Sequence, residues 1–361
     1  EVTTYRIDGE YEDSRHPKEV IFVRNLQEDL LRRDFTINAM AYNEKEGIVD
    51  IFGGMDDLRA GIIRCVGNAQ ARFSEDALRI LRGIRFAAQL GFELEDETRE
   101  GMRLLAPTLR KISAERIQVE LVKTLTSSRP DLLREAWKLG ITKEFLPEFD
   151  LAMETTQETV HHMYTVGEHI LHTLLEVRPD RILRLTMLLH DIGKPYMKTM
   201  DADGVAHFKG HPEKSSELAN EILHRLKFDN DTIRKVTKLV RYHDHRMPVT
   251  PAHVRRAVHE IGEDLFPLYL EVRRADVAAQ SMYQHKEKVA DIDGVEKLYH
   301  EIMERKECVS LKMLAVTGKD LIAAGMKPGK EIGQMLEHFL DLVLEHPELN
   351  QKEELLKRIE L

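Results

Sequence analysis

The sequence predicts a mainly helical protein with a small mixed α/β part at its N-terminal end. From Arg72 onward, apolar side chains recur at helical spacing in nearly every segment, with Gly and Pro between segments. Residues 1–66 instead alternate short strand-like runs with polar loops. A length of 361 residues, 42% of them hydrophobic and 32% charged, provides enough core for two to four domains.

The N-terminal part is expected to hold four strands and one helix. β-branched and aromatic residues in short runs indicate the strands, and an apolar frame around polar residues indicates the helix. The strands are expected at Glu1–Tyr5, Glu19–Val23, Ile48–Phe52 and Ile62–Val66, and the helix at Leu26–Tyr42.

The rest of the chain is expected to be helical throughout, without a fixed-period repeat. The expected helices are 72–91, 95–107, 113–127, 129–139, 158–177, 181–190, 213–227, 230–245, 251–261, 264–283, 286–304, 317–325, 330–346 and 348–360.

Composition narrows the class of protein. No apolar run approaches the roughly 20 residues that a membrane-spanning helix needs. The two cysteines, Cys65 and Cys308, form no disulfide or metal framework, which fits a cytoplasmic protein. A net charge of −10 argues against a protein that coats nucleic acid uniformly, although it allows a local basic groove.

The segment Ala71–Phe92 carries the first candidate site. Ser74 is a suitable N-cap for a helix. Asp76, Arg79, Arg82 and Arg85 follow at intervals of three, so one helix face carries one carboxylate and three guanidiniums. Such a face can bind phosphate or the edge of a base. The alternative is a solvated face with an ion pair between Asp76 and Arg79.

Three runs of sequence resemble a known family. They are RRDFTINAMAY at residues 32–42, DLRAGIIRCVGNAQARFSEDALRILRGIRFAAQLGF at 57–92 and ISAERIQVEL at 112–121. They closely resemble bacterial class II tRNA nucleotidyltransferases and the related bacterial poly(A) polymerases. The resemblance is dense up to about residue 125 and looser from there to the C-terminus.

The resemblance assigns nucleotide-binding roles. Arg32, Arg33, Asp34 and Asn38 match the motif that holds the triphosphate and senses the ribose. Two adjacent arginines can neutralise phosphate charge, and Asp34 and Asn38 lie one helical turn apart.

The resemblance also gives the helix face a role. Asp76 and Arg79 match the pair that binds the edge of the incoming base and selects CTP and then ATP. Arg82 and Arg85 would lie nearby and contact phosphate or the RNA. Ala114–Arg116 matches a neck motif that braces this helix.

One family motif does not occur in the sequence. In the family, a Gly-Ser and paired-aspartate motif that binds two Mg²⁺ ions precedes a strand like Glu1–Tyr5. Glu1 matches the third carboxylate of that site, and the alternative for it is an ordinary strand-edge charge. Since metal ions must bridge the triphosphate, we expect further residues to precede Glu1.

The helical part carries a second candidate site. Its members resemble, in order and spacing, the metal ligands of HD-superfamily phosphohydrolases. They are His169, His190, Asp191 and Asp276, with His211 and His243 at outer positions. Imidazole and carboxylate donors together suit Mg²⁺, Mn²⁺, Ni²⁺ or Fe²⁺. Lys194 is expected to steady a phosphoryl oxygen in catalysis.

Other histidines and lysines are weaker candidates. His161 and His162 are alternatives to His169, since both lie about two helical turns before it. His207, His224 and His245 are interpreted as surface or structural residues. In the tail, Lys319, Lys327 and Lys330 flank helix starts and suit RNA phosphates, or else are solvated lysines on a capped hairpin.

These observations predict four parts: residues 1–66 as the C-terminal portion of an incomplete nucleotidyltransferase head, 67–155 as a neck with the nucleotide-recognition helices, 156–285 as an HD metal-phosphohydrolase domain, and 286–361 as a helical tail suited to contact tRNA. The predicted function is addition of CCA to tRNA 3′ ends from CTP and ATP with Mg²⁺. The HD part would hydrolyse 2′,3′-cyclic phosphates or 2′-phosphates in RNA repair.

Three alternatives stay open. The first is a poly(A) polymerase, or an enzyme that adds only C or only A, because the family shares the template motif. The second is an HD phosphohydrolase whose head docks RNA. The third is an RNA-binding scaffold with both sites idle. The oligomeric state does not follow from the sequence.

Overall fold

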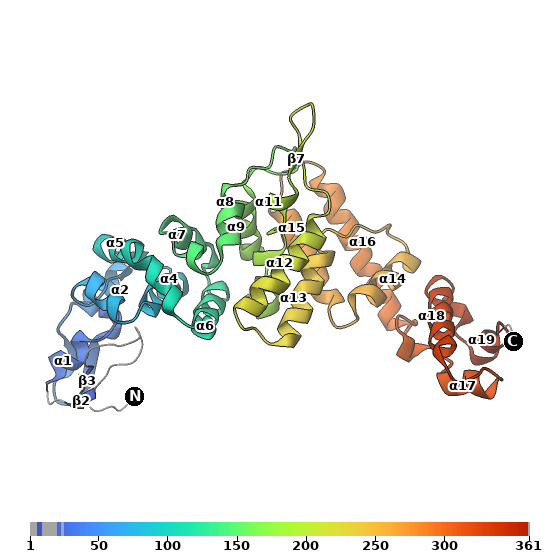
Figure 1. Ribbon diagram of the computed structural model, residues 1–361, viewed down its shortest axis with the longest axis horizontal. Helices are drawn as coiled ribbons and strands as arrows, with labels where there is room; N and C mark the ends of the chain where they lie inside the picture. The colour runs from blue at the N-terminus through green and yellow to red at the C-terminus, as the bar shows by residue number, and fades with distance from the viewer. Residues whose placement is uncertain (1–5, 9–19, 23–24, 360–361) are drawn as a thin grey trace. The chain divides into compact units, whose positions relative to one another are not determined.

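The computed structural model describes residues 6–8, 20–22 and 25–359 (Figure 1). The chain divides into two compact units. The first comprises Glu1–Arg241 with Ala278–Ser281, and the second comprises Tyr242–Val277 with Met282–Leu361. The protein is mainly helical, as the sequence predicts. The expected division into four parts stays a prediction.

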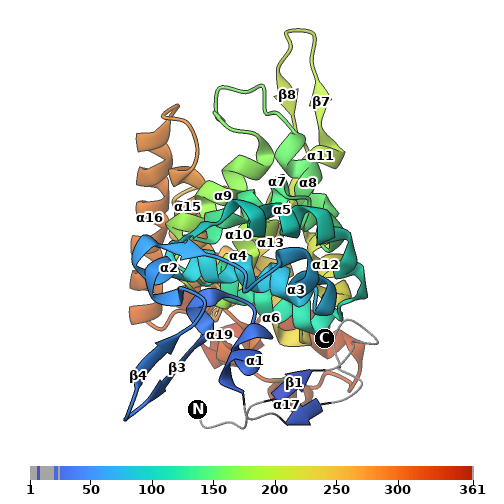
Figure 2. The same cartoon turned by 90° about the vertical axis from the view of Figure 1, so that its left-hand side faces the viewer.

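The described strands form four two-stranded sheets. Three are antiparallel and one is parallel: β1 (Arg6–Asp8) with β2 (Val20–Phe22), β3 (Met40–Asn43) with β4 (Gly47–Asp50), β5 (Ile62–Ile63) with β6 (Glu93–Leu94) in parallel, and β7 (Thr199–Met200) with β8 (Ala206–His207). Figure 2 shows the β3–β4 and β7–β8 hairpins. The strand expected at Glu1–Tyr5 lies outside the described residues.

Helices make up most of both units. The α-helices are α1 (Leu26–Leu31), α2 (Gly54–Ala60), α3 (Ala69–Glu75), α4 (Leu78–Leu90), α5 (Asp96–Leu105), α6 (Ala114–Leu125), α7 (Leu133–Lys138), α8 (Pro147–Glu154), α9 (Val166–Glu176), α10 (Arg181–Leu189), α11 (Lys194–Met197), α12 (His211–Arg225), α13 (Asn230–Tyr242), α14 (Pro251–Ile261), α15 (Phe266–Ala278), α16 (His285–Glu304), α17 (Gly318–Ala323), α18 (Lys330–Glu345) and α19 (Lys352–Leu356). None of the described helices combines the length and apolarity that crossing a bilayer requires.

The expected helix at Leu26–Tyr42 is wrong beyond its first two turns. The helix ends at Leu31, and a 3₁₀ turn at Thr36–Asn38 and strand β3 follow. The backbone of Thr36 donates to the Arg64 carbonyl at 2.9 Å, so this stretch pairs with another chain segment instead of with itself. Phe35 is fully buried, which explains the apolar frame without a helix.

The expected helix at 72–91 is two helices, α3 and α4, separated at Asp76. Asp76 has an extended backbone (φ −142°, ψ 102°), and its side chain accepts a hydrogen bond from the backbone N–H of Leu78 at 3.0 Å. This local bond competes with helix continuation and starts α4. Ser74 therefore lies within α3 and is not an N-cap. Asn68 caps α3 instead.

Glycine allows α4 to pack closely beneath the N-terminal motif. A Cβ atom at Gly83 would lie 2.1 Å from Cε of Met102 and 3.0 Å from Cζ of Phe35. The absence of a side chain at this position thus brings the α4 backbone against Phe35, which follows directly after Asp34.

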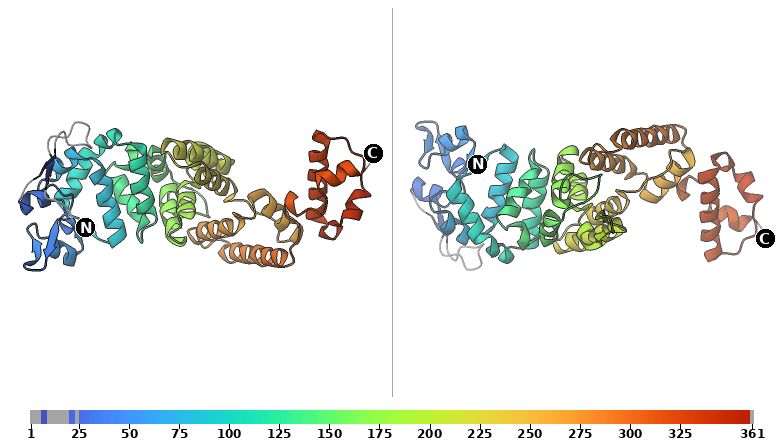
Figure 3. Two further views of the ribbon diagram at one scale, coloured as in Figure 1. Left: turned by 90° about the horizontal axis from the view of Figure 1, so that it is seen from below. Right: turned by 90° about the horizontal axis from the view of Figure 1, so that it is seen from above.

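In the second unit, α17, α18 and α19 share a small core of their own around Leu321, Phe339 and Val343. Figure 3 shows this tail, in red, and the long helix α16, in brown. Arg255 of α14 reaches the C-terminal end of α18, where its Nε donates to the Leu344 carbonyl at 2.6 Å and an Nη donates to the Glu345 carbonyl at 3.2 Å. Arg255 is buried and also pairs with Glu307 at 2.7 Å. Guanidinium groups suit the exposed carbonyls at a helix end.

Candidate functional site

A buried carboxylate holds the paired arginines of the N-terminal motif. Asp29 of α1, 1% exposed, accepts from Nε and Nη2 of Arg32 at 3.1 and 2.7 Å, and Arg33 lies 3.5 Å from its other oxygen. Both arginines remain partly exposed. Sequence reasoning missed Asp29, although its spacing of three and four residues before the arginines is a helix-pair signal.

Asp34 and Asn38 lie together, as expected. The Asn38 side-chain amide donates to Oδ1 of Asp34 at 3.3 Å, and the backbone N–H of Phe35 donates to the same oxygen at 2.9 Å. Nε and Nη2 of Arg82 both lie 2.6 Å from the other oxygen, Oδ2. Arg82 thus contacts the carboxylate of the motif directly.

Arg79 connects α4 with the same motif. It is buried, and one Nη donates to Glu75 at 2.7 Å and to the Arg72 carbonyl at 2.9 Å. Its other Nη donates to the Arg32 carbonyl at 2.9 Å. The structure therefore brings α4 into contact with the motif that begins at Arg32.

Asp76 does not pair with Arg79, so the alternative interpretation of a simple Asp76–Arg79 ion pair is wrong. Oδ2 of Asp76 accepts from Arg116 of α6 at 2.7 Å, and both side chains are partly buried. Arg116 belongs to the motif expected to brace the template helix, and this contact agrees with that expectation.

A second ion pair joins α4 to α6. Nε of Arg85 lies 2.7 Å from Glu120, and both side chains are at most 10% exposed. Burial lowers the pKa of Arg85, and the charge of Glu120 opposes that shift. Arg85 is thus engaged in helix packing, and its expected contact with phosphate or RNA stays a prediction. Glu1 lies outside the described residues.

Three histidines of the first unit converge on Asp191. His169 lies in α9, His190 ends α10 and His211 begins α12. Their Nε2 atoms lie 3.5, 3.4 and 3.4 Å from carboxylate oxygens of Asp191. The Nε2 atoms of His169 and His190 are 3.3 Å apart.

The opposite ring nitrogens of these histidines face backbone carbonyls. Nδ1 of His190 lies 2.7 Å from the Met187 carbonyl, Nδ1 of His211 lies 2.9 Å from that of Phe208, and Nδ1 of His169 lies 3.3 Å from that of Ala279. A carbonyl only accepts, so Nδ1 of each ring is suited to donate to it, which leaves the lone pair of Nε2 in the neutral ring available to a metal ion. Three lone pairs around a buried carboxylate form a donor set that fits a divalent cation.

Asp191 is ionised within this cluster. Burial opposes its ionisation, but the neighbouring Lys194, His190 and His211 hold its pKa well below the ordinary value. Nζ of Lys194 lies 2.7 Å from Oδ2 of Asp191. Lys194 also donates to Oε1 of Gln157 at 2.9 Å and lies 3.4 Å from Nε2 of His162.

Gln157 was not expected from the sequence, since no spacing rule links it to Lys194. His162 lies beside the cluster, with its ring 5.0 Å from that of His169, but it does not take the place of His169. His243 and Asp276 belong to the second unit, where His243 is buried and its carbonyl accepts from Arg273 at 3.2 Å. Their role as ligands stays a prediction.

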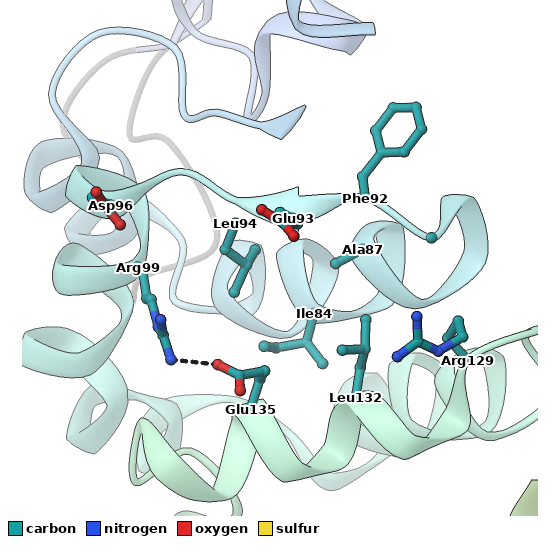
Figure 4. Close-up of a pocket in the computed structure, with 11 residues that line it drawn as sticks. Ile84, Ala87, Phe92, Glu93, Leu94, Asp96, Arg99, Arg129, Leu132 and Glu135 are labelled. Atoms are coloured by element: carbon teal, nitrogen blue, oxygen red, sulfur yellow. Dashed lines mark hydrogen bonds and ion pairs between the residues drawn. The ribbon is translucent and has the colours of Figure 1, made fainter. Parts of the chain in front are cut away.

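The first unit also contains a cavity of about 420 Å³ beside α4 (Figure 4). Ile84, Leu94 and Leu132 line it, and Arg99 pairs with Glu135 at its edge at 2.5 Å. None of the residues predicted to bind nucleotide lines this cavity. Ile84 and Ala87 lie on a different face of α4 from Arg79 and Arg82.

Three described sequence families match parts of the chain. Residues 1–64 match "Poly A polymerase head domain", residues 91–153 match "Probable RNA and SrmB- binding site of polymerase A", and residues 208–359 match "tRNA nucleotidyltransferase domain 2 putative". The fold and these matches define a protein of the nucleotidyltransferase class, with domains like those of poly(A) polymerases and tRNA nucleotidyltransferases.

Individual relatives narrow this class. The chain is 33% identical to the CCA-adding enzyme of Streptococcus thermophilus in an alignment of 363 residues. This alignment covers 99% of the chain and 77% of the relative. It therefore belongs to the family of CCA-adding tRNA nucleotidyltransferases. It is also 34% identical over 329 residues to the A-adding tRNA nucleotidyltransferase of Deinococcus radiodurans, covering 86% of the chain and 74% of the relative. The chain is also 34% identical to the CCA-adding enzyme of Leuconostoc mesenteroides in an alignment of 270 residues. This alignment covers 70% of the chain, and the chain spans 65% of the length of that enzyme.

Solved structures agree with the fold. The Bacillus stearothermophilus CCA-adding enzyme in complex with CTP matches with a TM-score of 0.65 and 25% identity, over 96% of this chain and 74% of that one. The Thermotoga maritima CCA-adding enzyme complexed with tRNA matches in fold, with a TM-score of 0.54 and 22% identity over 93% of this chain and 74% of that one.

Proposed function

We propose that this protein adds C, C and A to tRNA 3′ ends from CTP and ATP. The observation that carries the proposal is the contact between the two nucleotide motifs, in which Arg79 donates to the Arg32 carbonyl at 2.9 Å. One site can then hold the triphosphate and the base of the same nucleotide.

The residues have distinct roles in this proposal. Arg32 and Arg33, which Asp29 holds in place, bind the triphosphate. Asp34 and Asn38 accept hydrogen bonds from the ribose hydroxyls. Asp76 accepts from the exocyclic amine of cytosine or adenine, and Arg79 donates to a ring acceptor of the same base. Arg82 of α4 holds Asp34 in place, and Lys319, Lys327 and Lys330 contact the tRNA.

Nucleotidyl transfer also needs Mg²⁺, which supplies charge neutralisation at the triphosphate. The resemblance assigns that site to carboxylates preceding Glu1, with Glu1 as the third. The chain spans 65% to 78% of the length of the relatives in the long alignments.

The test is an extension assay with the full-length protein. It uses tRNA transcripts that end before CCA, before the second C and before A, with CTP and ATP offered separately and together. Ordered addition of C, C and A followed by a stop is the expected result. Long A tails would establish a poly(A) polymerase, and addition of one nucleotide type would establish a C-adding or A-adding enzyme.

The histidine cluster favours a second function. We propose that it binds Mg²⁺, Mn²⁺ or Ni²⁺ through His169, His190, Asp191 and His211, with His243 and Asp276 as the further ligands that the HD resemblance implies. The three Nε2 lone pairs around Asp191 support this. A divalent cation there would supply Lewis acidity toward a phosphoester, and Lys194 would bind a phosphoryl oxygen. The substrate class is RNA ends with 2′,3′-cyclic phosphate or 2′-phosphate, in tRNA repair.

This second function is tested in two assays, with and without added metal ions: opening of a 2′,3′-cyclic RNA end to a phosphomonoester, and release of phosphate from RNA with a 2′-phosphate. Metal-dependent hydrolysis is expected. Hydrolysis without any nucleotide addition would assign the protein's activity to the HD part and leave the head as an RNA-docking element. Absence of both activities would favour the scaffold.

A further inference from the structure

The ribose carboxylate and the base-template helix are joined by one side chain. Arg82 of α4 places both Nε and Nη2 at 2.6 Å from Oδ2 of Asp34. The two residues are 48 positions apart in the chain, so the contact depends on tertiary packing and not on local spacing.

A carboxylate as buried as that of Asp34 needs such a partner. The Asp34 side chain is 7% exposed, and a carboxylate removed from water is costly unless it is paired. Oδ1 already accepts from the Phe35 N–H and from Asn38. Arg82 supplies the compensating charge at Oδ2. Arg82 also fixes the orientation of the Asp34 carboxylate, because two nitrogens of its planar guanidinium group contact the same oxygen.

The same helix face holds the backbone of the motif. Arg79 precedes Arg82 by three residues and donates to the Arg32 carbonyl at 2.9 Å. One face of α4 therefore contacts the motif at two points, the backbone of Arg32 and the side chain of Asp34. Residues three positions apart are neighbours on one face of a helix.

We infer that Arg82 is a positioning residue for sugar selection, and that it couples recognition of the ribose by Asp34 to recognition of the base by α4. It acts through Asp34 instead of contacting phosphate or RNA itself. This inference rests on the proposed nucleotide site, because it takes Asp34 as the residue that accepts the ribose hydroxyls.

The first experiment compares binding of CTP and dCTP to the full-length protein in Mg²⁺ buffer by calorimetry. In Arg82→Gln, the preference for CTP over dCTP is expected to fall on the order of tenfold, since a charge-assisted hydrogen bond to the ribose-binding carboxylate is lost. Arg103→Gln, which removes an exposed arginine paired with Glu100, is the matched control and should leave the ratio unchanged.

A double-mutant cycle tests whether the effect passes through Asp34. Asp34→Asn should lower the same ratio, and the double variant Arg82→Gln/Asp34→Asn should lose no more than Asp34→Asn alone. Arg82→Lys retains the charge without the fork and serves if the Gln variant does not fold. It should recover part of the sugar preference.

The outcomes separate this inference from the proposed function. An equal loss of affinity for CTP and dCTP in Arg82→Gln would overturn the inference, because it would mean direct contact with the triphosphate. Additive effects in the double variant would overturn it as well. Failure of the unaltered protein to bind either nucleotide would instead overturn the proposed nucleotide site and remove the basis of the inference.

Discussion

Arg116 and Asp76 are joined by a hydrogen bond of 2.7 Å, although 40 positions separate them in the chain. The other oxygen of Asp76 accepts from the Leu78 N–H. Hydrogen bonds from the protein thus orient both oxygens of Asp76, the carboxylate expected to bind the base. One donor lies on α6 and the other at the start of α4. Orientation of this kind reduces the rearrangement required when a base binds.

The first prediction concerns Arg116→Gln. Loss of the charged donor frees one side of Asp76, so we expect the preference for CTP over UTP to fall on the order of tenfold. UTP carries a carbonyl where CTP carries the amine that Asp76 would accept from. The measurement is single-nucleotide addition to tRNA ending before CCA. Arg110→Gln is the control, since Arg110 is an exposed arginine that pairs with Glu144. Unchanged selection in Arg116→Gln would contradict an orienting role.

The second prediction concerns the buried pair between Arg85 and Glu120. Glu120→Gln leaves the guanidinium of Arg85 buried without its counter-charge, which we expect to lower the free energy of unfolding by about 3–5 kcal/mol. The double variant Arg85→Met/Glu120→Leu should lose less than Glu120→Gln, because both charges are removed together. Urea unfolding followed by circular dichroism measures both. A double variant less stable than Glu120→Gln would show that the pair contributes net stability.

The third prediction concerns the histidine cluster. Asp191→Asn removes the one carboxylate among the four grouped donors His169, His190, Asp191 and His211, so Mn²⁺ affinity and hydrolysis of 2′,3′-cyclic-phosphate RNA ends should both be lost. Addition of CCA by the same variant should continue, because none of the nucleotide-binding residues changes. His224→Ala, an exposed histidine of α12, is the matched control. Retained Mn²⁺ binding in Asp191→Asn would remove the metal assignment.

The fourth prediction concerns thiol chemistry. Burial raises the pKa of Cys65 to about 12, although the charges of Arg79 and Arg72 partly oppose the shift. The thiolate is the reactive form, so Cys65 should resist iodoacetamide at pH 8, and its alkylation should increase as the pH rises toward 12. Mass spectrometry of the native protein tests this, with urea-unfolded protein as the reference. Alkylation of native Cys65 at pH 8 at the unfolded rate would contradict it.

The sequence predicts the helical architecture well because long, strongly periodic segments bury one face whatever their surroundings. It fails where a single polar contact competes with the helix. The break at Asp76 arises from the bonds to Leu78 and Arg116, and the second of these partners is remote in the chain. The stretch after Leu31 appears helical because Phe35 and Ala39 are apolar, yet both are buried by packing outside a helix.

The candidate sites show the same contrast between features that a local sequence pattern predicts and contacts that depend on residues remote in the chain. Motif resemblance predicts roles for Asp34, Arg79 and His190, since their residue types are tied to particular chemistry. It does not identify the residues that hold them, such as Asp29 for the arginines and Gln157 for Lys194. The proton position on His169 depends on the carbonyl of Ala279, 110 residues away, and no local pattern encodes that contact.

The hydrogen bonds from Arg255 to the end of α18 limit how hybrid proteins can be assembled from related chains. A chain cut before Leu344 would leave a buried guanidinium of α14 facing no carbonyl, so removing the tail would damage the helix that remains. Hybrid proteins that graft a foreign tail onto this chain should carry α14 and α18 from the same parent. The boundary between interchangeable modules therefore lies before Pro251, well upstream of the tail itself.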